Sequence, residues 1–148
     1  APDNNTPTLS PSTPLAASVL LVKEHVLRTT GAPQLLRSLK GSGLALLGAR
    51  LLFLRSTLGS AAQLGLDSSV APGPLLALAT AAHDVTNRLQ TLSGASDPKL
   101  AARTDPGSWR SKFGIDRTHN AVSTCRHAKG AARALAYFFG SRVAGGPR

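Results

Sequence analysis

The chain has 148 residues, 42% of them hydrophobic, which suits one domain with its own core and is too short for two comfortable domains. Its 17 lysine and arginine residues against 7 aspartate and glutamate residues give a formal net charge of +10, which favours a polyanionic partner. The longest apolar run, residues 44–54, contains Arg50 and is shorter than the roughly 20 residues that cross a bilayer, so no membrane span is expected. A lone cysteine, Cys125, excludes a disulfide framework and a cysteine metal cluster.

The composition divides the chain into three parts. Residues 1–16 are rich in proline and carry neither a basic nor an apolar signal region, so they predict a disordered or extended arm. Whether a targeting peptide was removed before Ala1 stays open. Residues 17–140 form the predicted domain, and residues 141–148 a basic tail.

The first half of the domain predicts a strand, a helix and a second strand. Residues 17–23, ASVLLVK, are apolar and β-branched, as is typical of a buried strand. A helix follows, with Pro33 near its start, a stop signal at Gly41, and an apolar stripe of Leu35, Leu36 and Leu39. Residues 44–54 predict the second strand. Residues 56–71 are small, polar and interrupted by glycine, so any helix there is short.

The second half predicts a strand over residues 73–79 and a helix that ends at Gly94, with Val85, Leu89 and Leu92 on one face. Residues 96–118 are rich in proline, glycine and aspartate and predict a long loop. A brief fourth strand follows at residues 121–122, and a closing helix buries Ala131, Leu135, Phe138 and Phe139. Together these elements predict an α+β sandwich of the ferredoxin-like type, βαββαβ.

Several segments carry a resemblance to one family. Residues 97–122, DPKLAARTDPGSWRSKFGIDRTHNAV, resemble a loop and strand of the nucleoside diphosphate kinases, and ARALAYFF is similar to their final helix. VLLVKEH, SGLALLGARLLFL and PGPLLALA resemble the first three strands, so the likeness covers about residues 17–140. It implies the fold of that family with a shortened helical hairpin, and it is nearest to a divergent, often cilium-associated branch.

The resemblance also implies what the chain has lost. The family transfers phosphate through a phosphohistidine, and that histidine aligns with Ser123, without an aligned base to activate the hydroxyl. A family aspartate aligns with Arg126, and the glutamate that orients the histidine aligns with Ala134. Residues 56–71, which replace the hairpin, contain no aromatic residue to stack on a base. We therefore expect a pseudoenzyme that needs no cofactor and binds nucleotide weakly or not at all.

Three candidates for residual phosphate binding remain, namely Lys23, Arg110 and Asn120. For each we favour an ordinary role: Lys23 ends a strand in solvent, Arg110 solvates the loop, and Asn120 satisfies loop amides. A further phosphate-binding arginine of the family aligns with Gln90 and is not matched by Arg88.

The histidines predict no second site. His127 follows the lost nucleophile but is expected to project from the start of the last helix, and so is not a substitute. His25, His83 and His119 lack the spacing and carboxylate companions of a metal site, and a surface or loop role is expected for each. Trp109 predicts a packing anchor. Cys125, although beside Arg126, predicts a structural thiol.

Two classes of function remain. The favoured one is a structural subunit of a large assembly, docked through basic residues of which we select Arg126, Lys129, Arg133 and Arg142. Its partner is expected to be an acidic lattice such as tubulin, in a ciliary axoneme or on microtubules of the cytoskeleton. The alternative within this class is an RNA-contacting subunit of a mitochondrial ribosome or other organellar complex. The second class is a residual nucleotide sensor or kinase. The oligomeric state stays open.

Overall fold

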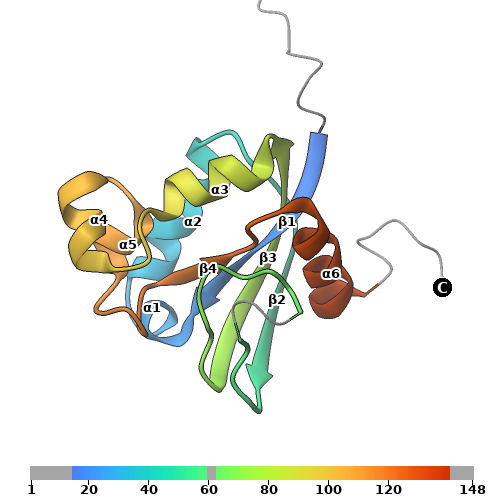
Figure 1. Cartoon of the computed structure of the whole chain (residues 1–148), viewed down its shortest axis with the longest axis horizontal. Helices are drawn as coiled ribbons and strands as arrows, with labels where there is room; N and C mark the ends of the chain where they lie inside the picture. The colour runs from blue at the N-terminus through green and yellow to red at the C-terminus, as the bar shows by residue number, and fades with distance from the viewer. Residues whose placement is uncertain (1–14, 60–62, 141–148) are drawn as a thin grey trace, which may run out of the picture.

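The computed structural model describes residues 15–59 and 63–140. Its centre is a four-stranded antiparallel sheet in the order β2-β3-β1-β4 (Figure 1). The strands are β1 (Leu15–Lys23), β2 (Ala45–Leu54), β3 (Gly73–His83) and β4 (Val122–Thr124). The predicted arm loses two residues to β1, which starts at Leu15. The remainder of the arm and the tail, which includes Arg142, lie outside the described residues.

Helices cover both faces of the sheet (Figure 1). They are α1 (Glu24–Leu27), α2 (Gly31–Gly41), α3 (Val85–Ser93), α4 (Pro98–Thr104), α5 (Trp109–Phe113) and α6 (Ala128–Phe139). Because successive strand residues point to opposite faces, Leu20 of β1 packs with α2 and α3, whereas Leu21 packs with α6. This arrangement confirms the predicted α+β sandwich of the ferredoxin-like, βαββαβ type. No helix in the described part of the chain is long and apolar enough to cross a membrane.

The predicted long loop at residues 96–118 is wrong, because it contains two short helices. Asp97 caps α4 by accepting a hydrogen bond from the amide of Lys99, and Pro98 occupies the first turn. Ser108 caps α5 in the same way, through the amide of Ser111. The aspartate, proline and serine that suggested a loop are therefore helix-start signals, and the helices are too short to show a clear apolar period.

The connection between β2 and β3 folds onto β4 without forming a helix in its described residues, 55–59 and 63–72. Two isolated antiparallel bridges hold it, Leu58 to Val70 and Leu66 to Cys125. Leu64, Leu66 and Val70 are buried in the core beneath α6. The connection is consequently a packed part of the domain, and it places Asp67 beside Thr124 at the C-terminal end of β4.

Candidate functional site

The position that we align with the family's histidine lies where β1 and β4 pair. Ser123 of β4 stands opposite Leu21 of β1, and its side chain is fully buried. Lys23 ends β1, Asn120 precedes β4, and Arg110 reaches in from α5. The fold thus brings together the four residues that the sequence placed at a former phosphotransfer site.

An acidic residue that the sequence analysis did not select occupies the middle of this site. The Arg110 guanidinium donates through Nη2 to both carboxylate oxygens of Asp67, each at 2.9 Å. The two side chains are only 1% and 6% exposed, so this ion pair is shielded from water. Arg110 is held further by the carbonyls of Gly94, at 2.8 Å from Nη1, and of Val122, at 3.0 Å from Nη2.

Other donors converge on the same carboxylate. The amide of Thr124 donates to Asp67 Oδ1 at 3.0 Å, and the Thr124 hydroxyl lies 3.3 Å from Oδ2. Gln90 Nε2 lies 3.3 Å from Oδ2 and 2.6 Å from Thr124 Oγ1. Gln90 stands where the resembling family has a phosphate-binding arginine, and here it serves an internal carboxylate. With these donors, Asp67 is solvated by the protein in place of water.

The Ser123 hydroxyl is directed at a backbone acceptor. Its Oγ lies 2.8 Å from the carbonyl oxygen of Ser68 and 3.3 Å from Asp67 Oδ1, so the single proton goes to the nearer carbonyl. No base aligns with Ser123 in the sequence, but the structure places the carboxylate of Asp67 beside it. That carboxylate is already engaged by Arg110 and by the amide of Thr124, and a carbonyl oxygen cannot take the hydroxyl proton as a base.

Lys23 and Asn120 form a second polar pair next to this network. Lys23 Nζ donates to Asn120 Oδ1 at 2.6 Å and lies 3.4 Å from the carbonyl of Thr118. Burial, and then the charge of Arg110, lowers the pKa of Lys23 from 10.5 to about 8. The Asn120 amide donates to the Ser96 carbonyl at 2.9 Å, which ties the β4 entrance to the loop before α4.

The structure can now be compared with the roles expected for Lys23, Arg110 and Asn120. Lys23 and Arg110 are buried, at 5% and 1% exposure, so the expectation that they project into solvent is wrong. Their partners, Asn120 and Asp67, come from distant parts of the chain, which no local pattern shows. Asn120 contacts the loop, but it donates to the Ser96 carbonyl instead of accepting from loop amides as expected. A hollow of about 370 Å³ lies beside Lys23, His25 and His119, and its lining does not include Ser123 or Arg110.

The remaining degenerate positions lie around α6. Ala134 is buried against the sheet. Arg126, Lys129 and Arg133 are exposed, as expected for the outer side of the last helix. Arg126 also keeps its backbone amide on the Gly65 carbonyl, at 2.8 Å.

Two of the histidines, His25 and His127, accept hydrogen bonds from backbone amides. His127 caps α6, its Nδ1 accepting from the Gly130 amide at 3.0 Å, which confirms that it stands at the start of the helix. His25 Nε2 accepts from the Ala121 amide at 2.9 Å, and its ring meets His119 edge-on with centroids 5.5 Å apart. Across residues 15–59 and 63–140, no cluster of three histidine, cysteine or acidic side chains is placed to hold a metal ion.

Trp109 and Cys125 are core residues, as predicted. Trp109 is 1% exposed and its indole Nε1 donates to Ser38 Oγ at 3.0 Å, which anchors α5 to α2. Cys125 is fully buried, and burial raises the pKa of its thiol to about 11. A thiol in that state is a poor nucleophile at neutral pH.

Sequence reasoning missed Asp67 because no motif surrounds it. One signal was present: Asp67 is the single acidic residue between Glu24 and Asp84 in a strongly basic chain. An isolated acid in residues 56–72, which contain no other charged residue, favours a buried ion pair, but the sequence alone does not name its partner.

Comparisons with known proteins agree with this geometry. The family model described as nucleoside diphosphate kinase matches residues 64–143, more than half of the chain. No curated protein sequence matches the chain.

Three solved structures illustrate the shared fold. The Aquifex aeolicus nucleoside diphosphate kinase superposes with a TM-score of 0.73 at 15% identity, covering 85% of this chain and 96% of that one. The Borrelia burgdorferi enzyme, solved with vanadate and ADP as a transition state mimic, gives 0.68 at 15% identity, with 84% and 87% covered. The apo enzyme from Encephalitozoon cuniculi gives 0.70 at 13% identity, with 89% and 92% covered.

Proposed function

Because the chain belongs to the nucleoside diphosphate kinase family, we propose that it is a catalytically inactive member that serves as an interaction subunit of a larger assembly. The observation that carries this proposal is the buried ion pair between Asp67 and Arg110 at the position of the lost nucleophile. The carboxylate of Asp67 occupies the arginine that the resemblance would assign to phosphate.

The ion pair opposes phosphate binding in two ways. Arg110 offers both of its terminal nitrogens to internal acceptors, so binding a phosphate there would require these hydrogen bonds to break. The incoming anion would also meet the carboxylate of Asp67 in a site shielded from water, where like charges repel strongly. Displacing Asp67 without a new partner would leave a buried charge unpaired, which costs on the order of 3–5 kcal/mol.

The chemistry of Ser123 points the same way. A serine attacks phosphate only when a base removes its proton, and here the proton is donated to a carbonyl oxygen. The side chain is fully buried on β4, whereas an attacking group must reach the phosphate in line with the leaving oxygen.

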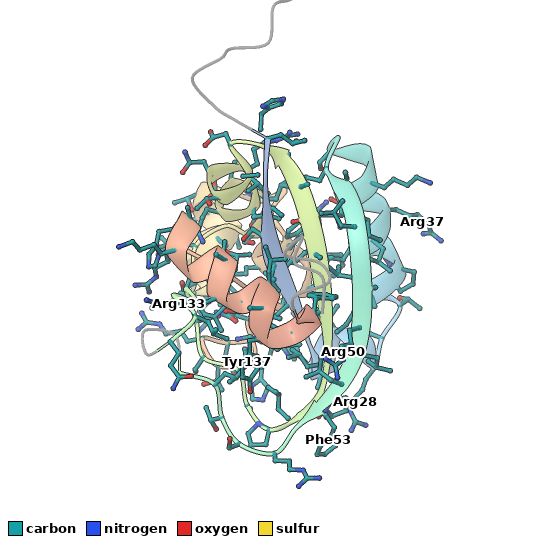
Figure 2. The ribbon with its side chains drawn as sticks, turned by 90° about the vertical axis from the view of Figure 1, so that its right-hand side faces the viewer. Arg28, Arg37, Arg50, Phe53, Arg133 and Tyr137 are labelled. Atoms are coloured by element: carbon teal, nitrogen blue, oxygen red, sulfur yellow. The ribbon has the colours of Figure 1, made fainter. Side chains whose placement is uncertain are left out.

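The interaction role is supported by the outer side of α6. Lys129 and Arg133 are exposed there, and Arg126 precedes them at the start of the helix. In Figure 2, Arg133 and Tyr137 lie along this helix on the side that faces the viewer. We favour an acidic protein surface of the tubulin type as the partner and keep RNA in an organellar complex as the alternative.

Phosphorylation by γ-labelled ATP tests the loss of catalysis. We expect neither the wild-type chain nor Ser123→His to form an acid-labile phosphoprotein, because the new imidazole would lack an orienting carboxylate at Ala134 and would face Asp67. The Aquifex aeolicus kinase serves as the positive control, and circular dichroism checks that the variant is folded.

Two results would contradict the proposal. One is transfer from ATP to a nucleoside diphosphate that Ser123→Ala abolishes. The other is phosphorylation of Ser123→His at a rate near that of the positive control, which would mean that Asp67 does not close the site.

A further inference from the structure

The outer side of α6 carries little charge for a surface helix. The inner side packs on β1 and β3, and no other helix or strand in the described part of the chain lies on the outer side (Figure 1). Six residues of the helix are exposed: Ala128, Lys129, Ala132, Arg133, Ala136 and Tyr137. A solvated helix face normally consists of charged and polar residues, whereas four of these six carry no charge. This face is therefore suited to a contact.

The exposed residues form two parallel rows, because residues four apart lie on the same side of a helix, about 6 Å from one another along its axis. The basic row consists of Lys129 and Arg133 and ends at Tyr137, and the alanine row consists of Ala128, Ala132 and Ala136. Figure 2 shows Arg133 and Tyr137 of the basic row on the side of α6 that faces the viewer. Long side chains and methyl groups thus run side by side along the whole helix.

The charges of the basic row have no carboxylate within the chain. Residues 117–148 contain six lysine and arginine residues and no aspartate or glutamate. None of the ion pairs between described residues includes Lys129 or Arg133. Arg126, just before the helix, also lies outside these pairs, and its Nη2 is 3.5 Å from the Asp67 carbonyl oxygen. These uncompensated cations attract a partner with negative charge.

The alanine row indicates the shape of that partner. An alanine side chain ends at its Cβ, so the row forms a shallow groove beside the longer side chains of the basic row. A ridge of side chains on a second helix fits such a groove, and small residues at the contact let two helix axes approach to about 8 Å. Because a second helix repeats with the same turn, its side chains stay in contact with the groove along its length.

A nucleic acid would use only half of this face. Proteins bind its phosphates through cations and hydrogen-bond donors, and its bases through aromatic rings and polar groups. The methyl groups of the alanine row offer neither charge nor hydrogen bonds. The two rows together therefore fit an acidic helix better than RNA.

A second copy of the chain and the two ends of this sequence are poor occupants. Packing α6 on α6 of another copy would bring two basic rows together without compensating carboxylates. Residues 1–14 contain one acidic residue, Asp3, and four prolines, which disfavour a helix. Residues 141–148 contain two arginines and no acidic residue. None of these provides the acidic helix that the face fits.

We propose that the outer side of α6 binds an acidic, amphipathic helix of a partner protein. Apolar residues of that helix lie in the groove of the alanine row, and carboxylates on one flank pair with Lys129 and Arg133. Tyr137, which is 54% exposed, covers the end of the contact with its ring. The inference rests on the proposed role as an interaction subunit and names the chemistry of its partner.

Selection of helical peptides tests this inference without a known partner. Peptides of about 20 residues, randomised on an alanine-rich scaffold and displayed on phage, are panned on the purified full chain. We expect enriched sequences to have apolar residues spaced three and four apart, with aspartate or glutamate on the adjacent flank. Their affinity should fall as salt rises. A scrambled peptide of the same composition keeps the charge, loses the amphipathic period, and should bind at least about tenfold more weakly.

Lysine substitution in the alanine row separates packing from charge. Ala132→Lys with Ala136→Lys adds two positive charges and fills the groove, and lysine is a good helix former. Affinity for the enriched peptide should fall by about tenfold or more, whereas a polyanion held by charge alone would bind equally or more tightly. The matched control, Thr91→Lys with Ala102→Lys, adds the same charge at exposed positions of α3 and α4 and should change the affinity by less than about twofold.

Removal of the basic row tests the other half of the face. Lys129→Gln with Arg133→Gln should weaken binding of the enriched peptide by about tenfold and reduce its dependence on salt, because the carboxylates of the peptide lose their partners. Circular dichroism of each variant checks that the fold is kept.

Four outcomes would overturn the inference: no enrichment, enriched peptides without an acidic flank, equal binding of the scrambled peptide, or unchanged affinity of Ala132→Lys with Ala136→Lys. Sedimentation tests a second copy, since a dimer that this lysine variant dissociates would assign the face to self-association. Poly(U) that binds more tightly than any enriched peptide, and is lost in Lys129→Gln with Arg133→Gln, would assign the face to RNA.

Co-purification with the native partner separates this inference from the proposed function. If charge reversal at Arg126, Lys129 and Arg133 dissociates the native complex while Ala132→Lys with Ala136→Lys leaves it intact, the interaction role stands and the helical partner is refuted. The phosphorylation assay is independent, so activity there refutes the inactive state and leaves the peptide result intact.

Discussion

Asp67 determines the charge and the hydrogen bonding of the site around Ser123. Its carboxylate joins the β2–β3 connection, through hydrogen bonds and an ion pair, to α3, α5 and β4. Each contact places a donor from a distant part of the chain on one buried anion, so the network stabilises the packing only when it is complete. The same network binds the Arg110 guanidinium to an internal carboxylate. This ion pair links the stability of the domain to its proposed inactivity.

His25 holds an unusual backbone position at the entrance of β4. Its Nε2 accepts from the amide of Ala121, whose φ of 78° is rarely adopted by residues other than glycine. An imidazole that accepts at Nε2 must be neutral on that nitrogen. Burial, followed by the charges of His119 and Lys23, lowers the pKa of His25 from 6.5 to about 4.

Stability should therefore fall in acid. The folded pKa of His25 lies below the unfolded value, so the unfolded chain takes up the proton first and this contribution is lost as pH falls from about 6.5 to 4. We expect a loss of about 1–2 kcal/mol in the free energy of unfolding, after a discount for partial exposure. Urea unfolding between pH 7 and 4 measures it.

His25→Gln provides the control, since a glutamine oxygen can accept from the Ala121 amide and does not titrate. The pH slope of this variant should be smaller than that of the wild type between pH 6.5 and 4. Equal slopes would show that His25 is not responsible.

Among the elements, α6 and the β2–β3 connection depend on close contact between two glycines. A Cβ on Gly130 would lie 2.5 Å from the Leu64 carbonyl oxygen and 3.2 Å from the Cα of Gly65. Gly65 itself has φ +61°, a conformation in which other residues are strained. The absence of side chains at both positions lets the connection pass under the start of α6 and present Asp67 to β4.

Gly130→Ala should destabilise the domain by about 1–3 kcal/mol, because the clash is with backbone atoms that cannot rotate away. Gly41→Ala, at the end of α2, is the matched control, since an added Cβ there meets nothing within 4 Å. Thermal unfolding measures both. Equal shifts in unfolding temperature for the two variants would contradict the prediction, because they would mean that the β2–β3 connection accommodates the added Cβ without loss of stability.

For the molecule as a whole, basic residues are exposed on several elements while its buried charges are paired or hydrogen bonded. Lys129 and Arg133 on α6 and Arg126 before it are exposed and belong to the basic C-terminal part of the chain. Arg142, the fourth residue that we selected for partner binding, lies outside the described residues. Such a surface attracts a polyanion over a distance that salt shortens.

Charge reversal at Arg126, Lys129 and Arg133 to glutamate should weaken association with the native partner by about tenfold or more, and added salt should weaken the wild-type complex. The measurement is co-purification of the tagged chain, with tubulin and ribosomal RNA assayed separately. Reversal at Lys99, Arg103 and Lys112, which changes the net charge equally on α4 and α5, is the control. Association that is unchanged by both added salt and charge reversal would contradict the prediction.

The sequence by itself determined the order of the main strands and helices. Apolar runs, the leucine stripe of α2 and the stop signals at Gly41 and Gly94 are local features, and their structure is decided by neighbours in the chain. It also selected Ser123, Ala134, Lys23, Arg110 and Asn120 as candidate positions of one site, through a resemblance whose family the comparisons support. The sequence did not determine the burial and the hydrogen-bond partners of these residues, and Lys23 and Arg110 were expected in solvent.

Tertiary structure alone decided what fills the site and what the edge of the sheet exposes. Asp67 is 43 residues from Arg110 and 56 from Ser123, and only the pairing of β1 with β4 and the fold of the β2–β3 connection bring the three together. Likewise the apolar run of residues 44–54 predicted a strand but not its neighbours, and its place at the end of the order β2-β3-β1-β4 leaves Leu51 and Phe53 exposed. Burial and ion pairing depend on contacts between distant segments, and for that reason local patterns do not contain them.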